Sequence, residues 1–448
     1  MSRLFRTVHV RPSELRSLLL SCAALFFLFT GYASLRPLRD SLGVTAGVKQ
    51  LGSLFGWTFF GMLVAMPLFG WLASRLPRRV FLPAVYGFFI LNLLGFYALY
   101  SFNQNDILLA RLFFVWVSVV NLFIVSLFWS LQADLHTVEQ GSRLFGSIAA
   151  GSSLGSVAGP ALTALLVGRI GHKNLLLCAA GLWTVALLLL LKLLRDRRDR
   201  TAPSPSPSPS PSPSPSEDPS PAADGGHAAE RPLGGNPLSG LVSTVRSPYL
   251  LGIGVFIVLL SATTTFLYMQ QAALLARAIA EPTARTRLLA TVDTVVNAVS
   301  LGLQLLVVGR LSVRYGLSLV LISVPLLMVA GFVTLAGVPS LQVLLFVMVV
   351  RRAGEYGLLR PGREVLFTSV DRSVKYKAKS FIDTVVYRGA DWLNARLHDV
   401  LVTLGLSTSG IALSGALVSL AWAAVGFALG RRHTRQQALL GTDMDKDA

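Results

Sequence analysis

The sequence has few charged residues and almost no cysteine. Only 14% of its 448 residues are Asp, Glu, Lys or Arg, whereas 53% are hydrophobic and the mean hydropathy is +0.61. This composition excludes an ordinary water-soluble enzyme and is typical of a polytopic membrane protein. Cys22 and Cys178 lie inside apolar runs without a disulfide or metal-ligand spacing, so we expect no cysteine chemistry.

Motifs of nucleotide-hydrolysing and zinc enzymes are also missing. The chain contains no Gly-x4-Gly-Lys-Ser/Thr phosphate loop and no His-Glu-x-x-His pair. We therefore expect no enzymatic activity, no cofactor and no metal, and in particular no pump driven by its own ATP hydrolysis.

Positive charge exceeds negative charge, with forty Lys and Arg against twenty-two Asp and Glu. A nucleic-acid partner is not expected, because no soluble segment is long or aromatic enough to form a basic recognition face. The cations instead cluster in tails and short connections between apolar runs, where they report the orientation of a membrane protein.

The apolar runs predict an all-α membrane protein with twelve transmembrane helices. We expect a six-helix bundle over residues 1–194, a disordered Pro/Ser-rich linker over 195–248, a second six-helix bundle over 249–430 and a tail over 431–448. The expected spans are 15–35, 51–74, 80–101, 107–131, 145–168, 174–194, 249–272, 288–309, 316–337, 340–360, 380–404 and 408–429.

An even number of spans places both termini on one side, and the basic clusters indicate which side. The clusters at Arg75–Arg79, Arg195–Arg200, Arg310–Arg314, Lys375–Lys379 and Arg431–Arg435 all fall on the side of the amino terminus. Because such clusters are retained in the cytoplasm, we expect both termini there. The high ratio of Arg to Lys favours a bacterial cytoplasmic (inner) membrane.

The predicted linker contains seven consecutive Pro-Ser repeats, from Pro203 to Ser216. Proline at alternate positions removes backbone donors and favours an extended polyproline-like chain. We therefore expect a semi-rigid spacer of roughly 40 Å between the two bundles.

Two loops at equivalent places resemble each other. Gly70, Leu72 and Arg75 match Gly309, Leu311 and Arg314 at a constant offset. Each loop resembles the signature loop of the major facilitator superfamily, Gly-x-Leu-x-Asp-Arg-x-Gly-Arg-Arg, which implies the two-bundle fold of that family.

The fifth predicted span is rich in regularly spaced glycine. Gly146, Gly155 and Gly159, followed by Pro160, resemble the antiporter motif of the same superfamily. Gly151, Gly155 and Gly159 also recur every four residues, and small residues at that spacing let a second helix pack closely. Close packing and an antiporter mechanism both explain the glycines.

Two stretches resemble the nucleotide (ATP/ADP) translocase family. The family's cation-Asp pair falls on Arg39-Asp40, its Pro-x-Lys-Glu motif on Pro361, Arg363 and Glu364, and its lysine-rich motif on Lys375, Lys377, Lys379 and Asp383. The resemblance implies ATP:ADP exchange and places Arg363 in the binding site. The family's glutamates in spans four and seven have no counterpart, and Val117 takes the first of these positions.

Charged residues also occur in the middle of predicted spans. Arg351 and Arg352 follow the apolar run Leu341–Val350, which places them about 15 Å into the hydrocarbon layer. Glu355 lies within reach of both on a helix. Intramembrane charges usually face a bundle interior and mark a transport path. On the eleventh span, Arg388, Asp391, His398 and Asp399 share one face.

These observations define a predicted site between the bundles. Pro37 is expected to break or kink the first span and to leave Arg36 and Arg39 at the outer vestibule. The alternative is that the charges only form ion pairs that lock the carboxy-terminal half. The predicted substrate-binding residues are Tyr32, Arg36, Arg39, Asn121, Tyr268, Gln271, Arg351, Arg352, Glu355, Arg363 and Arg388, and the candidate coupling acids are Asp293, Glu355 and Asp391.

The sequence thus predicts a secondary transporter that works by alternating access and exchanges a small anionic solute, phosphorylated and, by the translocase resemblance, a nucleotide. Guanidinium groups match phosphate and carboxylate oxygens, which favours an anion. A proton-coupled exporter of an organic solute and a non-transporting receptor or scaffold stay open. We expect the lipid bilayer and the solute as partners, and a monomer.

Overall fold

The computed structural model describes residues 11–75, 78–103, 106–201, 239–306, 308–370 and 372–444. Almost all of them are helical, and no β-strand occurs among them. Helices are the expected solution in a bilayer, because they satisfy their backbone hydrogen bonds internally. The prediction of an all-α membrane protein is confirmed.

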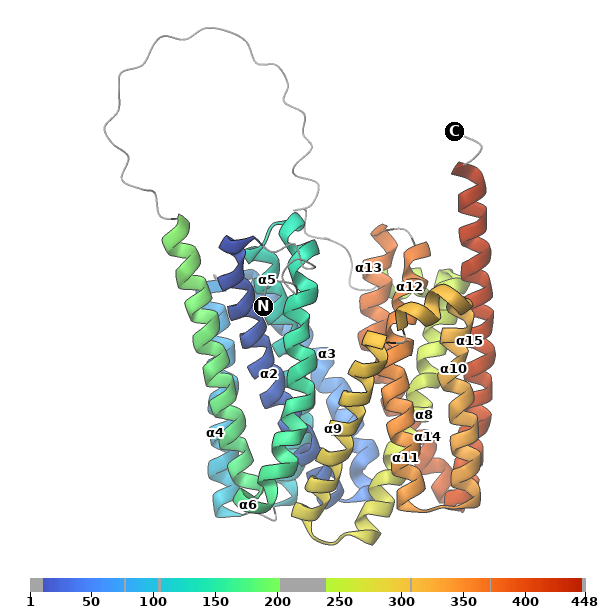
Figure 1. The fold of residues 1–448 in the computed structure, drawn as a ribbon. Coiled ribbons are helices and arrows are strands. Elements are labelled where there is room, and N and C mark those ends of the chain that lie inside the picture. Colours follow the sequence, from blue (N-terminus) through green and yellow to red (C-terminus); the bar gives the residue numbers. More distant parts are fainter. Residues whose placement is uncertain are drawn as a thin grey trace, which may run out of the picture.

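The described part of the amino-terminal half contains five α-helices, and Figure 1 shows them in blue to green. The last of them contains two membrane crossings, because the chain reverses at Gly171, whose φ of 75° favours glycine. The elements are α2 (Pro12–Thr45), α3 (Leu51–Arg75), α4 (Arg78–Phe102), α5 (Ile107–Leu135) and α6 (Val138–Thr201).

The carboxy-terminal half begins with a short helix and contains two π-helical turns, Glu355–Leu359 and Ile382–Val386. These turns join neighbouring helices into longer continuous segments. The helices are α7 (Ser239–Arg246), α8 (Pro248–Ala278), α9 (Pro282–Leu306), α10 (Val308–Gly337), α11 (Leu341–Gly354), α12 (Arg360–Leu366), α13 (Arg372–Phe381), α14 (Tyr387–Thr403) and α15 (Thr408–Met444).

The predicted number of crossings agrees with this architecture. Nine helical segments of the described chain are long and apolar enough to cross a membrane, and the segment Glu139–Asp196 contributes two crossings. The predicted spans 340–360 and 380–404 are helical but carry charge, and they complete the twelve. The start of α2 and the end of α15 lie at the same end of the bundle (Figure 1).

Several predicted boundaries were wrong. The linker expected over 195–248 is helical at both ends, where α6 continues to Thr201 and α7 spans Ser239–Arg246. The tail expected from residue 431 is also helical, because α15 continues to Met444. Hydropathy marks where a helix leaves the hydrocarbon layer, whereas a helix can extend beyond it. The Pro-Ser repeats lie outside the described residues.

Of the two outcomes expected at Pro37, a break or a kink, the break does not occur. Helix α2 runs through Pro37 to Thr45, so the first crossing extends ten residues beyond its predicted end at residue 35. Proline is tolerated inside membrane helices when neighbouring groups satisfy the backbone that it leaves unpaired. Pro37 has no N–H to donate to the carbonyl of Ala33, and Thr163 of α6 donates a hydrogen bond of 2.9 Å to the next carbonyl, that of Ser34.

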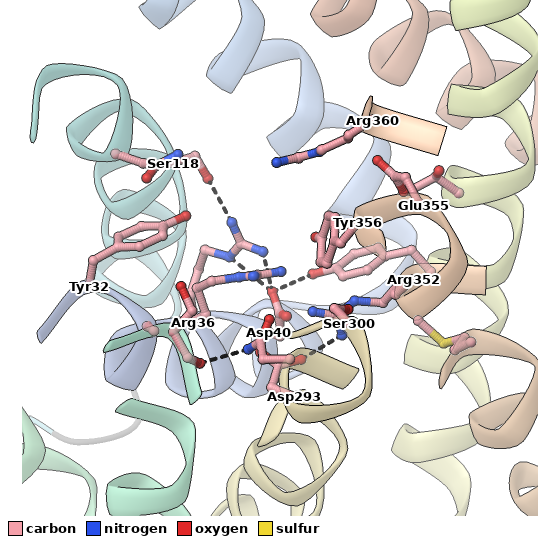
Figure 2. A pocket seen from close by; sticks show the side chains of 18 of the residues that line it. Tyr32, Arg36, Asp40, Ser118, Asp293, Ser300, Arg352, Glu355, Tyr356 and Arg360 are labelled. Atoms are coloured by element: carbon pink, nitrogen blue, oxygen red, sulfur yellow. Dashed lines mark hydrogen bonds and ion pairs between the residues drawn. The ribbon is translucent and has the colours of Figure 1, made fainter. Parts of the chain in front are cut away.

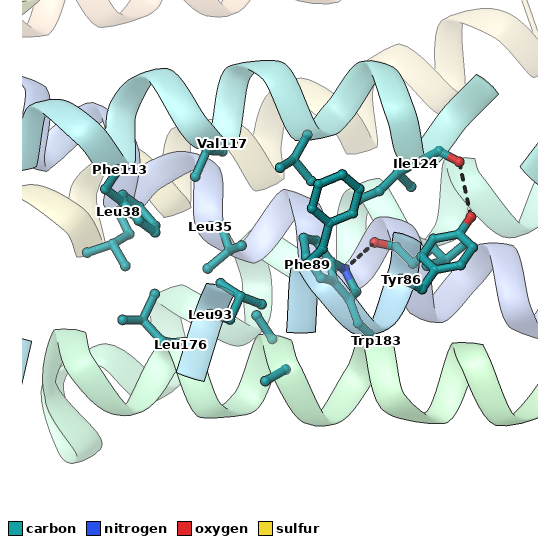
Figure 3. Packing of buried hydrophobic residues seen from close by; sticks show 14 of the residues in the cluster. Leu35, Leu38, Tyr86, Phe89, Leu93, Phe113, Val117, Ile124, Leu176 and Trp183 are labelled. Carbon is teal, nitrogen blue, oxygen red and sulfur yellow. Dashed lines mark hydrogen bonds between the residues drawn. The ribbon is translucent and has the colours of Figure 1, made fainter. Parts of the chain in front are cut away.

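Each half has its own apolar core. In the amino-terminal core, shown in Figure 3, Trp183 is fully buried and its indole N–H donates to the carbonyl of Leu28 at 3.1 Å. Tyr86 is also fully buried and donates to the carbonyl of Ile124 at 3.2 Å. Buried aromatic side chains with a polar atom usually find such a partner.

The glycine ridge on α6 packs directly against α2, which confirms the expected close packing. A methyl group added at Gly155 would lie 2.6 Å from the carbonyl oxygen of Phe26, and one at Gly151 would lie 2.3 Å from that of Cys22. The ridge also contains a Gly-x-Ser-x-Gly string from Gly151 to Gly155. This string lies inside a helix, whereas an esterase nucleophile requires a strand-to-helix turn.

Substitution of Gly155 by leucine is expected to lower the stability of the protein by about 3 kcal/mol, because the side chain would force α2 and α6 apart. Gly146 on the same helix provides the matched control, since nothing lies within 4 Å of a methyl group added there. Thermal unfolding of both purified variants tests the prediction. Equal melting temperatures would contradict the packing argument.

Candidate functional site

A cavity of about 710 Å³ lies between the two halves. Its walls come from α2, α3, α5 and α6 on one side and from α8, α9, α11, α12 and α14 on the other. Contacts that join the halves close its floor: Ser41 donates to the carbonyl of Pro282 at 3.1 Å, and His172 lies 3.0 Å from Thr286. These contacts lie at the end of the bundle away from the end of α15 (Figure 1).

The structure brings all the predicted site residues together in this cavity. The eleven predicted binding residues and the additional coupling candidates Asp293 and Asp391 line its wall. Their role in binding or coupling stays a prediction. The continuous α2 carries Arg36 and Arg39 into this cavity, and their position at an outer vestibule stays a prediction.

The cavity wall is charged and unbalanced. Among the described residues, seven arginines and five carboxylates line it, with no lysine or histidine. Each carboxylate forms one ion pair with an arginine. The pairs are Arg352–Asp293 at 2.5 Å, Arg39–Asp40 at 2.6 Å, Arg351–Glu355 at 2.8 Å, Arg363–Asp383 at 3.1 Å and Arg388–Asp391 at 3.4 Å.

Two arginines of the cavity have no carboxylate partner within the described chain. Arg36 comes from the amino-terminal half and forms no hydrogen bond or ion pair there, although Asp293 and Asp40 attract it from a distance. Arg360 comes from the carboxy-terminal half and stacks over the ring of Tyr356 at 4.6 Å. Figure 2 shows both side chains in the cavity. The cavity therefore contains two uncompensated positive charges, one from each half.

Arg39 and Asp40 form a cross-link between the halves. Asp40 accepts hydrogen bonds from Arg39 at 2.6 Å and from Tyr268 of α8 at 3.0 Å (Figure 2). Arg39 also donates to Ser118 at 3.3 Å and lies over the ring of Phe114 at 5.1 Å. The cation-Asp pair noted in the sequence thus ties the two halves together near the floor of the cavity.

Sequence reasoning missed Arg360 and Tyr356. The tenth span was expected to end at residue 360, where an arginine before Pro361 is typical of a membrane surface. The helix instead continues through the π-helical turn Glu355–Leu359 into α12, so Arg360 stays in the cavity wall. The spacing of four residues between Tyr356 and Arg360 was the available signal, since such residues meet on a helix.

The predicted polar face on α14 is only partly in the cavity. Arg388 and Asp391 line it, whereas His398 and Asp399 do not. His398 is buried against Phe266, and neither ring nitrogen has a hydrogen-bond partner in the described chain. Residues that share one face of this helix therefore differ in whether they reach the cavity. Their spacing in the sequence does not reveal this difference.

Two helical bundles around a central polar cavity define a multi-pass membrane protein of the transporter type. The sequence profile of the Major Facilitator Superfamily matches residues 18–361. The chain belongs to this superfamily.

Solved structures support the same fold. The chain is similar to a bacterial homologue of the human lysosomal transporter Spinster in an inward-facing and unoccupied conformation, with 14% identity, a TM-score of 0.59 and coverage of 95% of this chain and 99% of that one. It is also similar to a mutant of the nucleoside transporter NupG (14% identity, TM-score 0.57, coverage 94% and 99%) and to the POT family transporter PepTSo (14%, 0.62, 95% and 99%). At these identities the likeness shows the fold alone. No curated protein matches the chain in sequence.

Two contacts join positions of the translocase motifs. Arg363 pairs with Asp383 at 3.1 Å, and Lys379 pairs with Glu364. These pairs connect α12 to α13 and to the following π-helical turn at the edge of the cavity. The comparisons do not identify a translocase, so the resemblance stays a prediction.

Proposed function

We propose that this protein is a secondary transporter that carries a small anionic, phosphorylated solute across the membrane by alternating access. The excess of two guanidinium groups over carboxylates in the cavity carries the proposal. Uncompensated charge in a low-dielectric site is unfavourable, and an anion with two negative charges would neutralise Arg36 and Arg360 together.

The position of these two arginines suits alternating access. They belong to different halves, so a phosphate group held by both would link the halves as they rock about the site. Arg351 and Arg352, the arginines first expected to bind the solute, already hold carboxylates at 2.8 and 2.5 Å. In this proposal they shape the site, whereas Arg36 and Arg360 bind the anion.

The cavity is closed at the end opposite the termini. If the basic clusters lie in the cytoplasm, this is an inward-open state. Release of the cross-link between Asp40 and Tyr268 and of the contact between Ser41 and Pro282 would open the other side. We place the protein in a bacterial cytoplasmic membrane, which the high ratio of Arg to Lys favours.

A thermal-shift screen of the purified protein tests the proposal. Phosphate monoesters, sugar phosphates, nucleotides and dicarboxylates are compared with neutral and cationic analogues. A true ligand at about one hundred times its Kd stabilises the fold by about 2.7 kcal/mol. Stabilising anions are then tested for uptake and counterflow in proteoliposomes. Absence of stabilisation by every anion would refute the proposal.

Proton coupling is the second candidate, and Asp391 favours it. Its pair with Arg388 is the longest of the five at 3.4 Å, and it also accepts a hydrogen bond of 2.7 Å from Ser261. This carboxylate is therefore the least neutralised by arginine and the best placed to exchange a proton.

Replacement of Asp391 by asparagine is expected to abolish transport driven by a proton gradient while counterflow exchange continues. A protonophore would then inhibit the unmodified protein and leave the variant unaffected. Asp399→Asn, on the same helix outside the cavity, is the matched control. If the protonophore leaves transport by the unmodified protein unaffected, the result would instead favour solute exchange without proton coupling.

A further inference from the structure

A second, smaller cavity of about 90 Å³ adjoins the central one. It lies between α3 and the segment formed by the π-helical turn Ile382–Val386 and the start of α14. The two cavities share Asn121, Asp383 and Arg388 in their walls. The side cavity therefore begins at the charged wall of the central cavity.

The far wall of the side cavity is apolar. Helix α3 contributes Phe59, Met62, Leu63 and Met66, and α5 adds Leu122. Methionine adapts to irregular apolar partners, because its side chain is unbranched and polarisable. From the shared residues outward, the lining thus changes from guanidinium and carboxylate to hydrocarbon and thioether.

The outer edge of this cavity belongs to a surface of α3 that faces away from the protein. Leu63 is 38% exposed, and its neighbours Phe60 and Val64 are 47% and 71% exposed. In a membrane helix, such exposed apolar side chains face lipid. Trp392 of α14 lies next to this wall, where its ring stacks on that of Phe59 at a centroid distance of 6.2 Å.

The opposite seam between the halves is closed at mid-depth. There Asn297 of α9 donates to the carbonyl of Ser156 of α6 at 2.7 Å. The central cavity thus adjoins an apolar side cavity on the side of α3, whereas a direct hydrogen bond joins the two halves on the side of α6.

We infer that the transported anion is amphiphilic: a phosphate monoester of a single alkyl or acyl chain. This inference rests on the proposed function, because the phosphate binds Arg36 and Arg360. The chain passes Arg388 and occupies the side cavity, with its end directed toward the bilayer. The apolar far wall of this cavity favours hydrocarbon over water, whereas a wholly polar solute would leave this wall unmatched.

The test uses methyl, butyl and hexyl phosphate, which share one head group and differ only in chain length. Binding to the full-length protein in detergent is measured by titration. Burial of each methylene raises affinity about fourfold, so hexyl phosphate is expected to bind at least 100-fold more tightly than methyl phosphate. Hexyltrimethylammonium carries the same chain on a cation, and its binding is expected to be undetectable.

Met66→Trp fills the side cavity and is expected to bind all three phosphates with the affinity of methyl phosphate. Val64→Trp, on the exposed face of the same helix, is the matched control and is expected to keep the full dependence on chain length. If Met66→Trp fails to fold, the series on the unmodified protein still decides the matter.

The outcomes separate the two proposals. Equal binding of methyl and hexyl phosphate would overturn the amphiphile and leave anion transport intact. Absence of binding by every phosphate would overturn the proposed function itself. Tight binding of hexyltrimethylammonium, or an unchanged chain-length dependence in Met66→Trp, would place the chain elsewhere and also overturn the inference.

Discussion

Replacement of Arg36 or Arg360 by glutamine is expected to weaken binding of a phosphate monoester about 30-fold in each variant. Loss of one buried, hydrogen-bonded charge partner typically costs about 2 kcal/mol or more, and 1.4 kcal/mol corresponds to a factor of ten. The double variant is expected to lose binding altogether. Titration of methyl phosphate and uptake in proteoliposomes measure the effect.

The stability of the unliganded protein distinguishes a binding role from a structural one. Arg36 has no ion-pair or hydrogen-bond partner in the described chain, so its removal is expected to leave the melting temperature unchanged or higher. Arg432→Gln, on the exposed end of α15, controls for the loss of a positive charge. A fall in melting temperature for Arg36→Gln, with binding unchanged, would assign Arg36 to the scaffold.

The opposite pattern is expected for the pair of Arg352 and Asp293. Their side chains are only 9% and 5% exposed, and the closest nitrogen–oxygen distance is 2.5 Å. Removal of one partner leaves the other charge buried without compensation, which typically costs about 3–5 kcal/mol. Arg352→Gln and Asp293→Asn are therefore each expected to destabilise the protein by this amount.

A double-mutant cycle tests this prediction. The variant that carries both substitutions is expected to regain most of the lost stability, because no isolated charge stays buried. Thermal unfolding of the four proteins in the same detergent gives the coupling energy. Additive losses in the double variant would show that the two residues act independently, against the ion pair in the structure.

The variants of Arg36 and Arg360 test a role in solute binding, whereas those of Arg352 and Asp293 test a role in stability. The sequence alone does not distinguish these arginines. Arg351 and Arg352 stand out, because they interrupt an apolar run, and they were expected to bind the solute. In the structure each holds a carboxylate, from Glu355 and Asp293. We therefore place solute binding on the arginines without such partners.

The sequence by itself determined the class of protein, its helical membrane fold and many of the residues that line the cavity, although the contributions of α3 and α6 were not foreseen. Long apolar runs and repeated loops carry this information, because hydrophobic length and loop charge are local properties of the chain. The glycine ridge on α6 was also readable, since its spacing of four residues requires a closely packed neighbour.

Only the tertiary structure decided which charges pair and which face the cavity. The pairing of Arg352 with Asp293 joins α11 to α9, and no local pattern relates those positions. Thr163 from another helix donates to α2 in the turn before Pro37, and the place of Arg360 depends on a π-helical turn. Neutralisation of a charge requires a partner from elsewhere in the fold, and spacing along one helix does not reveal that partner.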